Sequence, residues 1–329
     1  MSHSIKNRIF KIENDSEFNS LALEIFQFQA KENQVYKEYI SYLGIDPQKI
    51  ARIENIPFLP IQFFKSRKVV SGNHETECEF SSSGTSGLGT SFHYISDLSI
   101  YEESFLKSFQ LFYGDPKKFH ILALLPSYLE KSGSSLIYMV NELIEKSGSN
   151  YSGFYLDEHE KLIKNLQFLK NRNDRKIILL GVSFALLDLI ENAPIDLSNV
   201  ILMETGGMKG KREEITRKEL HQVLCNGFNV PFVHSEYGMT ELLSQAFSAG
   251  GGVFKSPPWM KILIRDPYNP FGYLEKGRSG GINIIDLANI YSCSFIETQD
   301  LGRKIDANQF EVLGRFDNSD IRGCNLLVD

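Results

Sequence analysis

Four segments of the chain carry side chains that could bind a phosphorylated nucleotide. They are the run Ser81-Ser-Ser-Gly-Thr-Ser-Gly-Leu-Gly-Thr90, Glu236-Tyr-Gly-Met-Thr-Glu241, Thr298-Gln-Asp-Leu-Gly-Arg303 and Gly314-Arg-Phe-Asp317. In the first run, small residues let backbone N–H groups converge on an anion, and glycine tolerates the positive φ that such a concavity requires. Phosphate is therefore its natural ligand.

The serine- and glycine-rich run differs from the loop of ordinary P-loop NTPases. Leu88 and Gly89 follow Gly87 where that pattern places Lys and then Ser or Thr. On its own, such a turn is more often only a flexible connection between two strands. The phosphate interpretation therefore depends on the other three segments.

The composition indicates a large cytoplasmic protein without a membrane span. The chain has 329 residues, of which 42% are hydrophobic, which suits a sizeable core and about two domains. A net charge of -6 argues against a general nucleic-acid binder. The N-terminus lacks the apolar core of a signal peptide, and no apolar run approaches the ~20 residues of a membrane helix. The cysteines are too widely spaced to predict zinc or a disulfide framework: Cys78, Cys225, Cys293 and Cys324.

The periodicity of apolar residues predicts an α/β architecture. Residues 16 to 43 have mixed helical spacing, and two prolines then break helical continuity in Pro57-Phe-Leu-Pro60. From residue 97 onward helices alternate with short apolar strands. Helices are expected at 97–112, 133–147, 157–170, 183–191 and 212–226, and strands at 119–125, 151–155, 176–182, 199–203 and 231–234. After residue 250 the sequence predicts a smaller β-rich part, with strands at 259–265, 281–286 and 309–313.

The strands of the alternating region place two loops where ligands usually bind. Runs such as Ile177-Ile-Leu-Leu-Gly-Val182 are apolar on both faces, as in central strands that helices cover on each side. In such sheets ligands gather beyond the carboxyl ends of the strands. Glu204-Thr-Gly-Gly-Met-Lys209 and Glu236 to Glu241 both follow predicted strands, so we expect both loops to contribute to a site.

Read in order, the four segments resemble the signature blocks of the adenylate-forming superfamily of acyl-activating enzymes. Tyr237-Gly-Met-Thr-Glu241 matches the Tyr-Gly-x-Thr-Glu motif of that superfamily, and Gly314-Arg-Phe-Asp317 matches its Gly-Arg-x-x-Asp hinge segment. The resemblance covers roughly residues 57 to 324. Within the superfamily the chain is most similar to the acyl-protein synthetases of the bacterial bioluminescence fatty-acid reductase, on the evidence of Pro57-Phe-Leu-Pro60, Phe64-Lys65 and Thr205-Gly-Gly-Met-Lys209.

The resemblance implies a large adenylate-forming core with helix-covered sheets, over residues 1–314, whose β-rich part spans about 250–314. Residues 315–329 would form the hinge and a short tail. Most relatives continue with a domain of roughly a hundred residues that supplies a catalytic lysine. We therefore expect the chain to lack most of the usual C-terminal domain, and no residue here matches that lysine.

The resemblance also implies roles in binding ATP and Mg²⁺. Thr240 would bind the α-phosphate and Glu241 would hold Mg²⁺, a hard cation that prefers oxygen ligands. Tyr237, with the backbone of the two loops, would flank adenine. Asp300 would accept hydrogen bonds from the ribose, and Arg315 would donate to ribose or phosphate. The remaining nucleotide-binding candidates are Ser82, Ser83, Gly84, Thr85, Ser86 and Gly87 for the pyrophosphate, and Gly206, Gly207 and Gly238 near the adenine, while Asp317 would sit at the hinge.

Cys324 is the candidate for a covalent acyl carrier. The similar acyl-protein synthetases carry the activated acyl group on a cysteine close to the C-terminus, and Cys324 is the only cysteine so placed. The neighbouring Arg322 would favour the thiolate. A buried structural cysteine beside Leu326 and Leu327 is nearly as well supported.

Several residues have simpler interpretations. Lys65 could approach an anion, but a solvated lysine beside a buried strand fits it better. His74, His93, His120 and His234 lack the spacing of metal ligands and are interpreted as structural. Gln299 stands where many relatives have glycine.

The sequence as a whole predicts an ATP-dependent ligase. A carboxylic acid, plausibly fatty, would attack the α-phosphate to give acyl-AMP and pyrophosphate, and a thiol would then take the acyl group. That thiol is Cys324 or belongs to an acyl-carrier, acyltransferase or reductase partner. The alternatives are a ligase that delivers another acid to coenzyme A or to an acyl carrier protein, and a non-catalytic nucleotide- or acyl-binding subunit.

Overall fold

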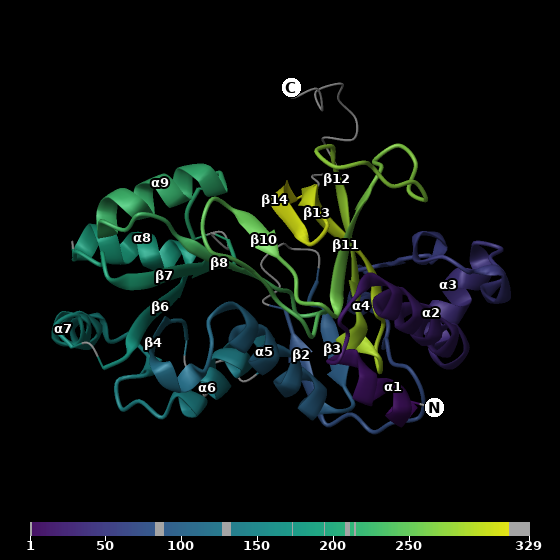
Figure 1. Ribbon diagram of the computed structural model, residues 1–329, viewed down its shortest axis with the longest axis horizontal. Coiled ribbons are helices and arrows are strands. Elements are labelled where there is room, and N and C mark those ends of the chain that lie inside the picture. Colours follow the sequence, from purple (N-terminus) through teal and green to yellow (C-terminus); the bar gives the residue numbers. More distant parts are fainter. Residues whose placement is uncertain are drawn as a thin grey trace.

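A twelve-stranded sheet runs through the described part of the protein (Figure 1). In this computed structural model the described residues are 2–82, 89–126, 133–172, 174–193, 195–207, 211–213 and 215–315. The strand order is β11-β12-β13-β14-β10-β9-β8-β7-β6-β4-β5, and β1 pairs with β13. The sheet therefore joins the alternating α/β region to the strands near the end of the chain.

One half of the sheet is parallel and covered by helices on both sides. It consists of β4 (Phe119–Leu124), β5 (Gly153–Phe154), β6 (Lys176–Val182), β7 (Val200–Thr205) and β8 (His234–Tyr237). In Figure 1, α8 (Ser183–Asn192) and α9 (Arg217–Phe228) lie on one side of these strands. On the other side lie α5 (Leu98–Phe112), α6 (Ser135–Ser147) and α7 (His159–Leu169). Every residue of β4 is buried, which explains the unbroken apolar run in that strand.

The other half of the sheet is mainly antiparallel. It contains β9 (Ala246–Ser248), β10 (Val253–Lys255), β11 (Met260–Arg265), β12 (Ser279–Asp286), β13 (Phe295–Asp306) and β14 (Gln309–Arg315). The two-residue strand β1 (Leu59–Pro60) is parallel to β13. The change of direction occurs between β8 and β9, so the two halves meet beside the Tyr237 motif.

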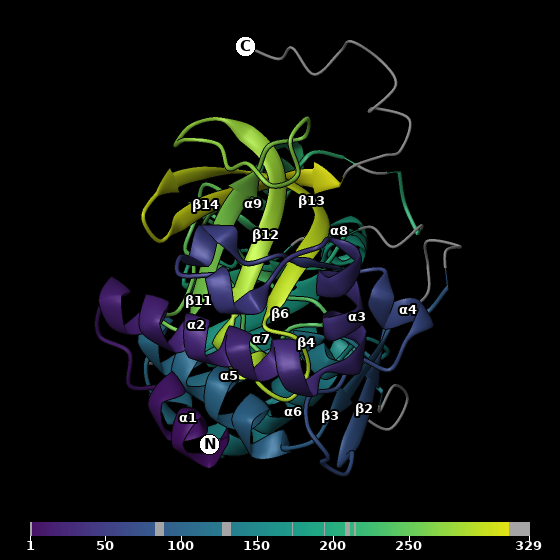
Figure 2. The same cartoon turned by 90° about the vertical axis from the view of Figure 1, so that its right-hand side faces the viewer.

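Three N-terminal helices pack against the antiparallel half (Figure 2). They are α1 (Ser2–Ile9), α2 (Asp15–Glu32) and α3 (Gln34–Tyr42). Asn33 separates α2 from α3, since its side chain accepts a hydrogen bond from the backbone N–H of Tyr36 and caps α3. Phe26 and Tyr36 pack on Phe295 of β13, with ring centroids 6.0 and 6.2 Å from it. The helices are thus fixed to the strand that also carries Asp300.

Short elements complete the connections. They are η1 (Pro47–Lys49), η2 (Ile53–Asn55), α4 (Phe63–Ser66), the hairpin β2 (Cys78–Ser81) and β3 (Phe92–Ile95), η3 (Pro116–Lys118) and η4 (Leu287–Asn289). The hairpin flanks the serine- and glycine-rich run, whose residues 83–88 lie outside the described part.

The structure confirms the predicted α/β class and corrects three elements. The helix expected over 16–43 is two helices, because Asn33 ends one and caps the next. The strand expected at 231–234 is instead His234–Tyr237, so the first residues of the Tyr237 motif belong to the strand itself. The long strand β13 was not predicted. The boundary between the core and its β-rich part stays a prediction.

Candidate nucleotide site

Two parallel neighbours, β7 and β8, end in exposed glycines at the same edge of the sheet. Thr205 of β7 stands opposite Glu236 of β8, and the Thr205 hydroxyl donates a hydrogen bond of 2.5 Å to the Glu236 carboxylate. Gly206 follows with φ of 66°, a conformation that favours glycine. At Gly238, a Cβ atom would lie 2.5 Å from Oε1 of Glu236. The turn at Gly206 therefore favours glycine, whereas a side chain at position 238 would displace the Glu236 carboxylate, and both glycines leave backbone exposed at the carboxyl ends of the strands.

Tyr237 and Asp300 form a buried pair that joins β8 to β13. The Tyr237 hydroxyl donates a hydrogen bond of 2.7 Å to Oδ2 of Asp300. Burial raises the pKa of Asp300, while the Tyr237 hydrogen bond and the charges of Arg315 and Arg217 oppose the rise. The Tyr237 ring packs against both Phe254 and Phe310, at centroid distances of 5.8 and 5.7 Å. The carboxylate is thus held in one position with an oxygen left for a further donor.

Arg315 reaches the same carboxylate from the neighbouring strand. Asp300 and Arg315 are partners across β13 and β14, and Nε of Arg315 lies 3.6 Å from Oδ1 of Asp300. The Arg315 side chain is 77% exposed, whereas that of Asp300 is 10% exposed. The guanidinium therefore remains largely available to an anionic ligand at this edge.

Glu241 is a second buried carboxylate in the same region. Burial raises its pKa, and hydrogen bonding to Ser91 and the charges of Arg315 and Lys65 oppose this rise. The backbone carbonyl of Glu241 accepts a hydrogen bond of 2.7 Å from the Asn289 side chain. The influence of Lys65 on Glu241 indicates that this lysine of α4 contributes to the potential of the site, which the sequence interpretation did not favour.

The residues after Glu241 are fixed by Asp286 at the end of β12. Its carboxylate accepts hydrogen bonds from the backbone N–H groups of Leu243 and Ser244, at 2.8 and 3.0 Å, and from the Ser244 hydroxyl at 2.6 Å. Burial raises the pKa of Asp286 to about 6. One fully buried side chain thus holds the loop that presents Thr240 and Glu241.

The β2–β3 hairpin contacts the same loop through His93. Nδ1 of His93 donates a hydrogen bond of 2.8 Å to the Thr240 carbonyl, and Nε2 has no partner among the described residues. Burial lowers the pKa of His93 to about 4, so the imidazole is neutral at pH 7. In the same hairpin, the Ser82 hydroxyl accepts a hydrogen bond of 2.9 Å from the backbone N–H of Ser91.

Arg217, at the start of α9, connects the two halves of the sheet. Its Nε lies 3.2 Å from a carboxylate oxygen of Glu204 in β7, and its Nη1 donates a 2.7 Å hydrogen bond to the Val312 carbonyl of β14. The guanidinium also lies over the Phe254 ring, 4.9 Å from its centroid. Arg217 therefore fixes β14, which carries Arg315, against the parallel strands.

All nine sequence-predicted site residues that the structure describes lie in one region. The structure brings together Ser82, Gly206, Gly207, Tyr237, Gly238, Thr240, Glu241, Asp300 and Arg315 around the carboxyl ends of β7 and β8, the β2–β3 hairpin and the β13–β14 pair. The other candidates, Ser83, Gly84, Thr85, Ser86, Gly87, Asp317 and Cys324, lie outside the described residues.

Sequence reasoning missed the residues that hold this arrangement. His93 was interpreted as structural, and only its place two residues after Ser91, beside the glycine-rich run, pointed to the site. Arg217 and Asp286 stand in no motif. Their contacts join positions 95 and 42 residues apart along the chain.

A magnesium ion fits the site only with ligands from a bound nucleotide. In the described ranges, no three or more His, Cys, Asp or Glu side chains are grouped to hold a metal ion. Mg²⁺ usually keeps waters and phosphate oxygens and takes one or two protein carboxylates. The buried Glu241 suits such a partial set.

Comparison with known proteins identifies the family. The family model described as "Acyl-protein synthetase, LuxE" matches residues 8–329. The chain belongs to this acyl-protein synthetase family. The LuxE assignment confirms the predicted family and the predicted enzyme class, a ligase that activates a carboxylic acid and transfers the acyl group.

A curated relative and solved structures of similar fold were also found. The long-chain-fatty-acid–luciferin-component ligase of Vibrio harveyi is 23% identical over 323 residues, which cover 92% of this chain and 84% of that protein. An open form of 2-hydroxyisobutyryl-CoA ligase, solved with 2-HIB-AMP and CoA, is similar with a TM-score of 0.66 and 12% identity, over 95% of this chain and 78% of that one. ATP-bound MatB from Rhodopseudomonas palustris gives a TM-score of 0.54 and 16% identity. That similarity covers 74% of this chain but only 49% of MatB.

No helix in the described part of the chain is both long and apolar enough to cross a membrane.

Proposed function

We propose that this acyl-protein synthetase uses ATP to activate a carboxylic acid at the carboxyl ends of β7 and β8. The observation that carries the proposal is the convergence of three motifs that are distant in the sequence. The Tyr237 hydroxyl donates a hydrogen bond of 2.7 Å to the Asp300 carboxylate, and Nε of Arg315 lies 3.6 Å from the same carboxylate. Acyl-adenylate formation brings an acid and a polyphosphate together, so it needs fixed acceptors for the nucleoside and fixed cations for the phosphates. The region supplies both.

The nucleoside would bind on the buried side of the site. Gly206, Gly207 and Gly238 leave backbone open for adenine beside Tyr237, and Asp300 has a carboxylate oxygen available to ribose hydroxyls. Support comes from relatives of the same fold that were solved with ATP or with an acyl-AMP. In this proposal the Tyr237 hydrogen bond keeps Asp300 ionised and oriented while it accepts those hydroxyls.

The phosphates would bind between the two loops and Arg315. Thr240 would donate to the α-phosphate, and Ser82 with residues 83–87 would bind the pyrophosphate. Glu241 would hold Mg²⁺, which would neutralise phosphate charge when bound. The charges of Lys65 and Arg315 already act on Glu241 and would add to that neutralisation.

A long-chain fatty acid is the proposed substrate, because the relative that matches most of the chain is named for that substrate. The final acceptor would be a protein thiol, either Cys324 or the thiol of an acyl-carrier, acyltransferase or reductase partner. In either case the thiolate attacks the acyl carbonyl and AMP leaves, so the thioester forms as the acyl–phosphate bond breaks.

The test is carboxylic-acid-dependent exchange of pyrophosphate into ATP by the purified protein, across short, long and aromatic acids. We expect exchange with long-chain acids, and mass analysis should then find a hydroxylamine-sensitive acyl adduct that Cys324→Ser abolishes. Exchange without an adduct would place the acceptor on a partner or on coenzyme A. If no acid supports exchange, with or without candidate acceptors, the proposed activity is wrong.

A further inference from the structure

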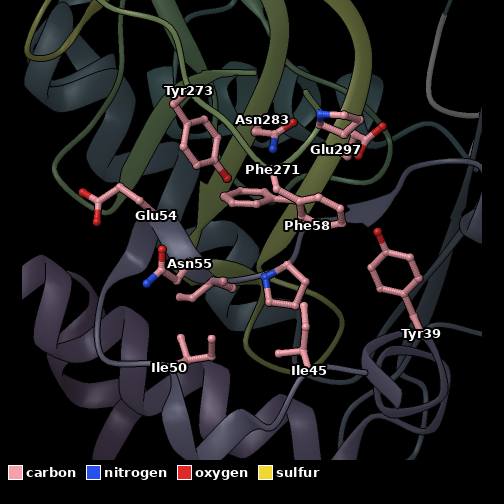
Figure 3. A pocket seen from close by; sticks show the side chains of 13 residues that line it. Tyr39, Ile45, Ile50, Glu54, Asn55, Phe58, Phe271, Tyr273, Asn283 and Glu297 are labelled. Carbon is pink, nitrogen blue, oxygen red and sulfur yellow. The ribbon is translucent and has the colours of Figure 1, made fainter. Parts of the chain in front are cut away.

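A cavity lies between the N-terminal segment and the antiparallel strands (Figure 3). Its volume is about 290 Å³, enough for roughly ten water-sized groups and near the lower end of small-ligand pockets. Residues of α3, of the segment 45–58, of the loop after β11 and of strands β12 and β13 line it. None of the proposed nucleotide ligands that the structure describes is among them.

Most of the lining is apolar or aromatic. Ile45, Ile50 and Phe58 come from the N-terminal segment, and Phe271 and Tyr273 come from the loop between β11 and β12. The Phe58 and Tyr273 rings meet edge to face, with centroids 6.2 Å apart. Phe271 remains 62% exposed although it lines the cavity. Such walls favour a ligand with an apolar body, and aromatic faces also attract cations.

Among the described residues, one carboxylate in the lining has no hydrogen-bond donor. Glu297 of β13 has a half-buried side chain, and the partner that the described residues give its carboxylate is the Arg265 guanidinium at 3.6 Å. Arg265 directs its N–H groups to the Asn283 side chain and to the Thr298 carbonyl as well. Burial raises the pKa of Glu297, as expected for a carboxylate that has lost water without gaining donors.

The side chains that line the cavity carry net negative charge. In the part of the chain that the structure describes, the lining contains two carboxylates, Glu54 and Glu297, and no Lys or Arg. Arg265 lies behind Glu297, and Arg52 pairs with Glu54 at 3.3 Å through a side chain that is 73% exposed, which makes that pair weak. A ligand that enters the cavity therefore meets acceptors and aromatic faces rather than cations.

We propose that this cavity binds an ammonium group carried on an apolar body, with Glu297 as its acceptor. The inference does not depend on the proposed acid activation, because it uses none of the nucleotide residues. An ammonium would give the Glu297 carboxylate the charge-assisted hydrogen bond that it lacks. The aromatic rings would cover the apolar body. The ammonium belongs either to a free amine or to a lysine side chain of a partner protein, since both present the same chemistry.

The test is titration calorimetry at pH 7 with three probes of one shape: 2-phenylethylammonium, 2-phenylethanol and 3-phenylpropionate. We expect the ammonium to bind about tenfold or more tightly than the alcohol, and the anion not to bind. Acetyl-lysine methylamide, which carries a free ε-ammonium on an amino-acid backbone, distinguishes the sources: binding tighter than that of 2-phenylethylammonium favours a protein lysine, and weaker binding favours a free amine.

Variants separate binding in the cavity from binding elsewhere. Glu297→Gln should weaken the ammonium about tenfold or more, whereas Glu275→Gln, an exposed carboxylate on the neighbouring loop that does not line the cavity, should leave it unchanged. Ile50→Trp should fill the cavity and abolish binding while Glu297 is retained. Equal affinity for the three probes, undiminished binding to Ile50→Trp and Glu297→Gln, or no ammonium binding to the unaltered protein would each overturn the proposal.

Discussion

Asp300 and Arg315 are partners across β13 and β14, but their surroundings differ. Asp300 is buried, held by Tyr237 and influenced by two arginines, whereas the Arg315 side chain is 77% exposed. The other site residues also differ in whether their side chains are buried or exposed. Tyr237, Asp300 and Glu241 are fixed within the fold before any ligand binds, while Arg315 is available to one. We therefore expect the buried residues to serve both the fold and the ligand, and the exposed arginine to serve the ligand alone.

The largest effect should come from Arg315→Ala. We expect acid-dependent pyrophosphate exchange to fall by about 10²- to 10³-fold, because a cation aimed at the reacting phosphates is lost. The midpoint of thermal unfolding should stay the same, since an exposed ion pair contributes little to stability. Arg303→Ala is the matched control, because Arg303 lies on β13 but pairs with Glu311. Exchange unaltered in Arg315→Ala would remove this arginine from the reaction.

The free energy of unfolding should depend on pH because of the buried His93. Its pKa is about 4 in the fold against about 6.5 for an unperturbed histidine, so the unfolded chain binds the proton more tightly. This contribution is fully present above pH 6.5 and is lost as the pH falls toward 4, by roughly 3 kcal/mol. Urea denaturation of the unaltered protein and of His93→Gln between pH 4 and 7 measures it. If the free energy of unfolding of the two proteins changes equally with pH, the pH dependence does not come from His93.

Asp300→Ala should lower both stability and activity. The change leaves the Tyr237 hydroxyl without its acceptor in a buried position, which costs roughly 1–3 kcal/mol. Exchange should also fall by about ten- to a hundredfold, because the proposed ribose acceptor is lost. Urea denaturation and the ATP dependence of exchange measure the two effects. A loss of activity with unchanged stability would show that the Tyr237–Asp300 pair does not support the fold. Asp300 would then resemble Arg315, which is expected to serve the ligand alone.

Tyr237→Phe should have the smallest effect. It removes one hydrogen bond but keeps the ring packed against Phe254 and Phe310, so we expect a loss of about 1 kcal/mol in the free energy of unfolding. The apparent KM for ATP should rise a few-fold. Combined with Asp300→Ala, the change should cost less than the sum of the two single variants, because both disrupt one interaction. Additive losses would mean that the two side chains act independently.

The sequence predicted the motifs of this site better than the structure around them. Alternation of helices and apolar strands located β4, β6, β7 and their helices, since these strands are buried on both faces. The limits of β8 were wrong because its second half contains Glu236, a buried carboxylate that is tolerated there through its bond with Thr205. A charge in a strand hides the apolar pattern on which prediction depends.

Strand β13 was missed for a related reason. It contains Glu297, Asp300 and Arg303 within one strand, and their partners lie on other elements. The supporting residues His93 and Arg217 were equally hidden, because a buried histidine or a helix-start arginine has no local sequence signal. Their roles arise from contacts that only the folded chain creates.

The most direct test of the account is a crystal structure of the protein with AMP and a long-chain fatty acid. We predict that adenine lies beside Tyr237 and the glycines that follow β7, with the ribose hydroxyls within hydrogen-bonding distance of Asp300 and the phosphate near Thr240 and Arg315. A nucleotide bound elsewhere, with the Tyr237–Asp300 pair free of contact, would contradict the central claim that these buried residues form the nucleotide site.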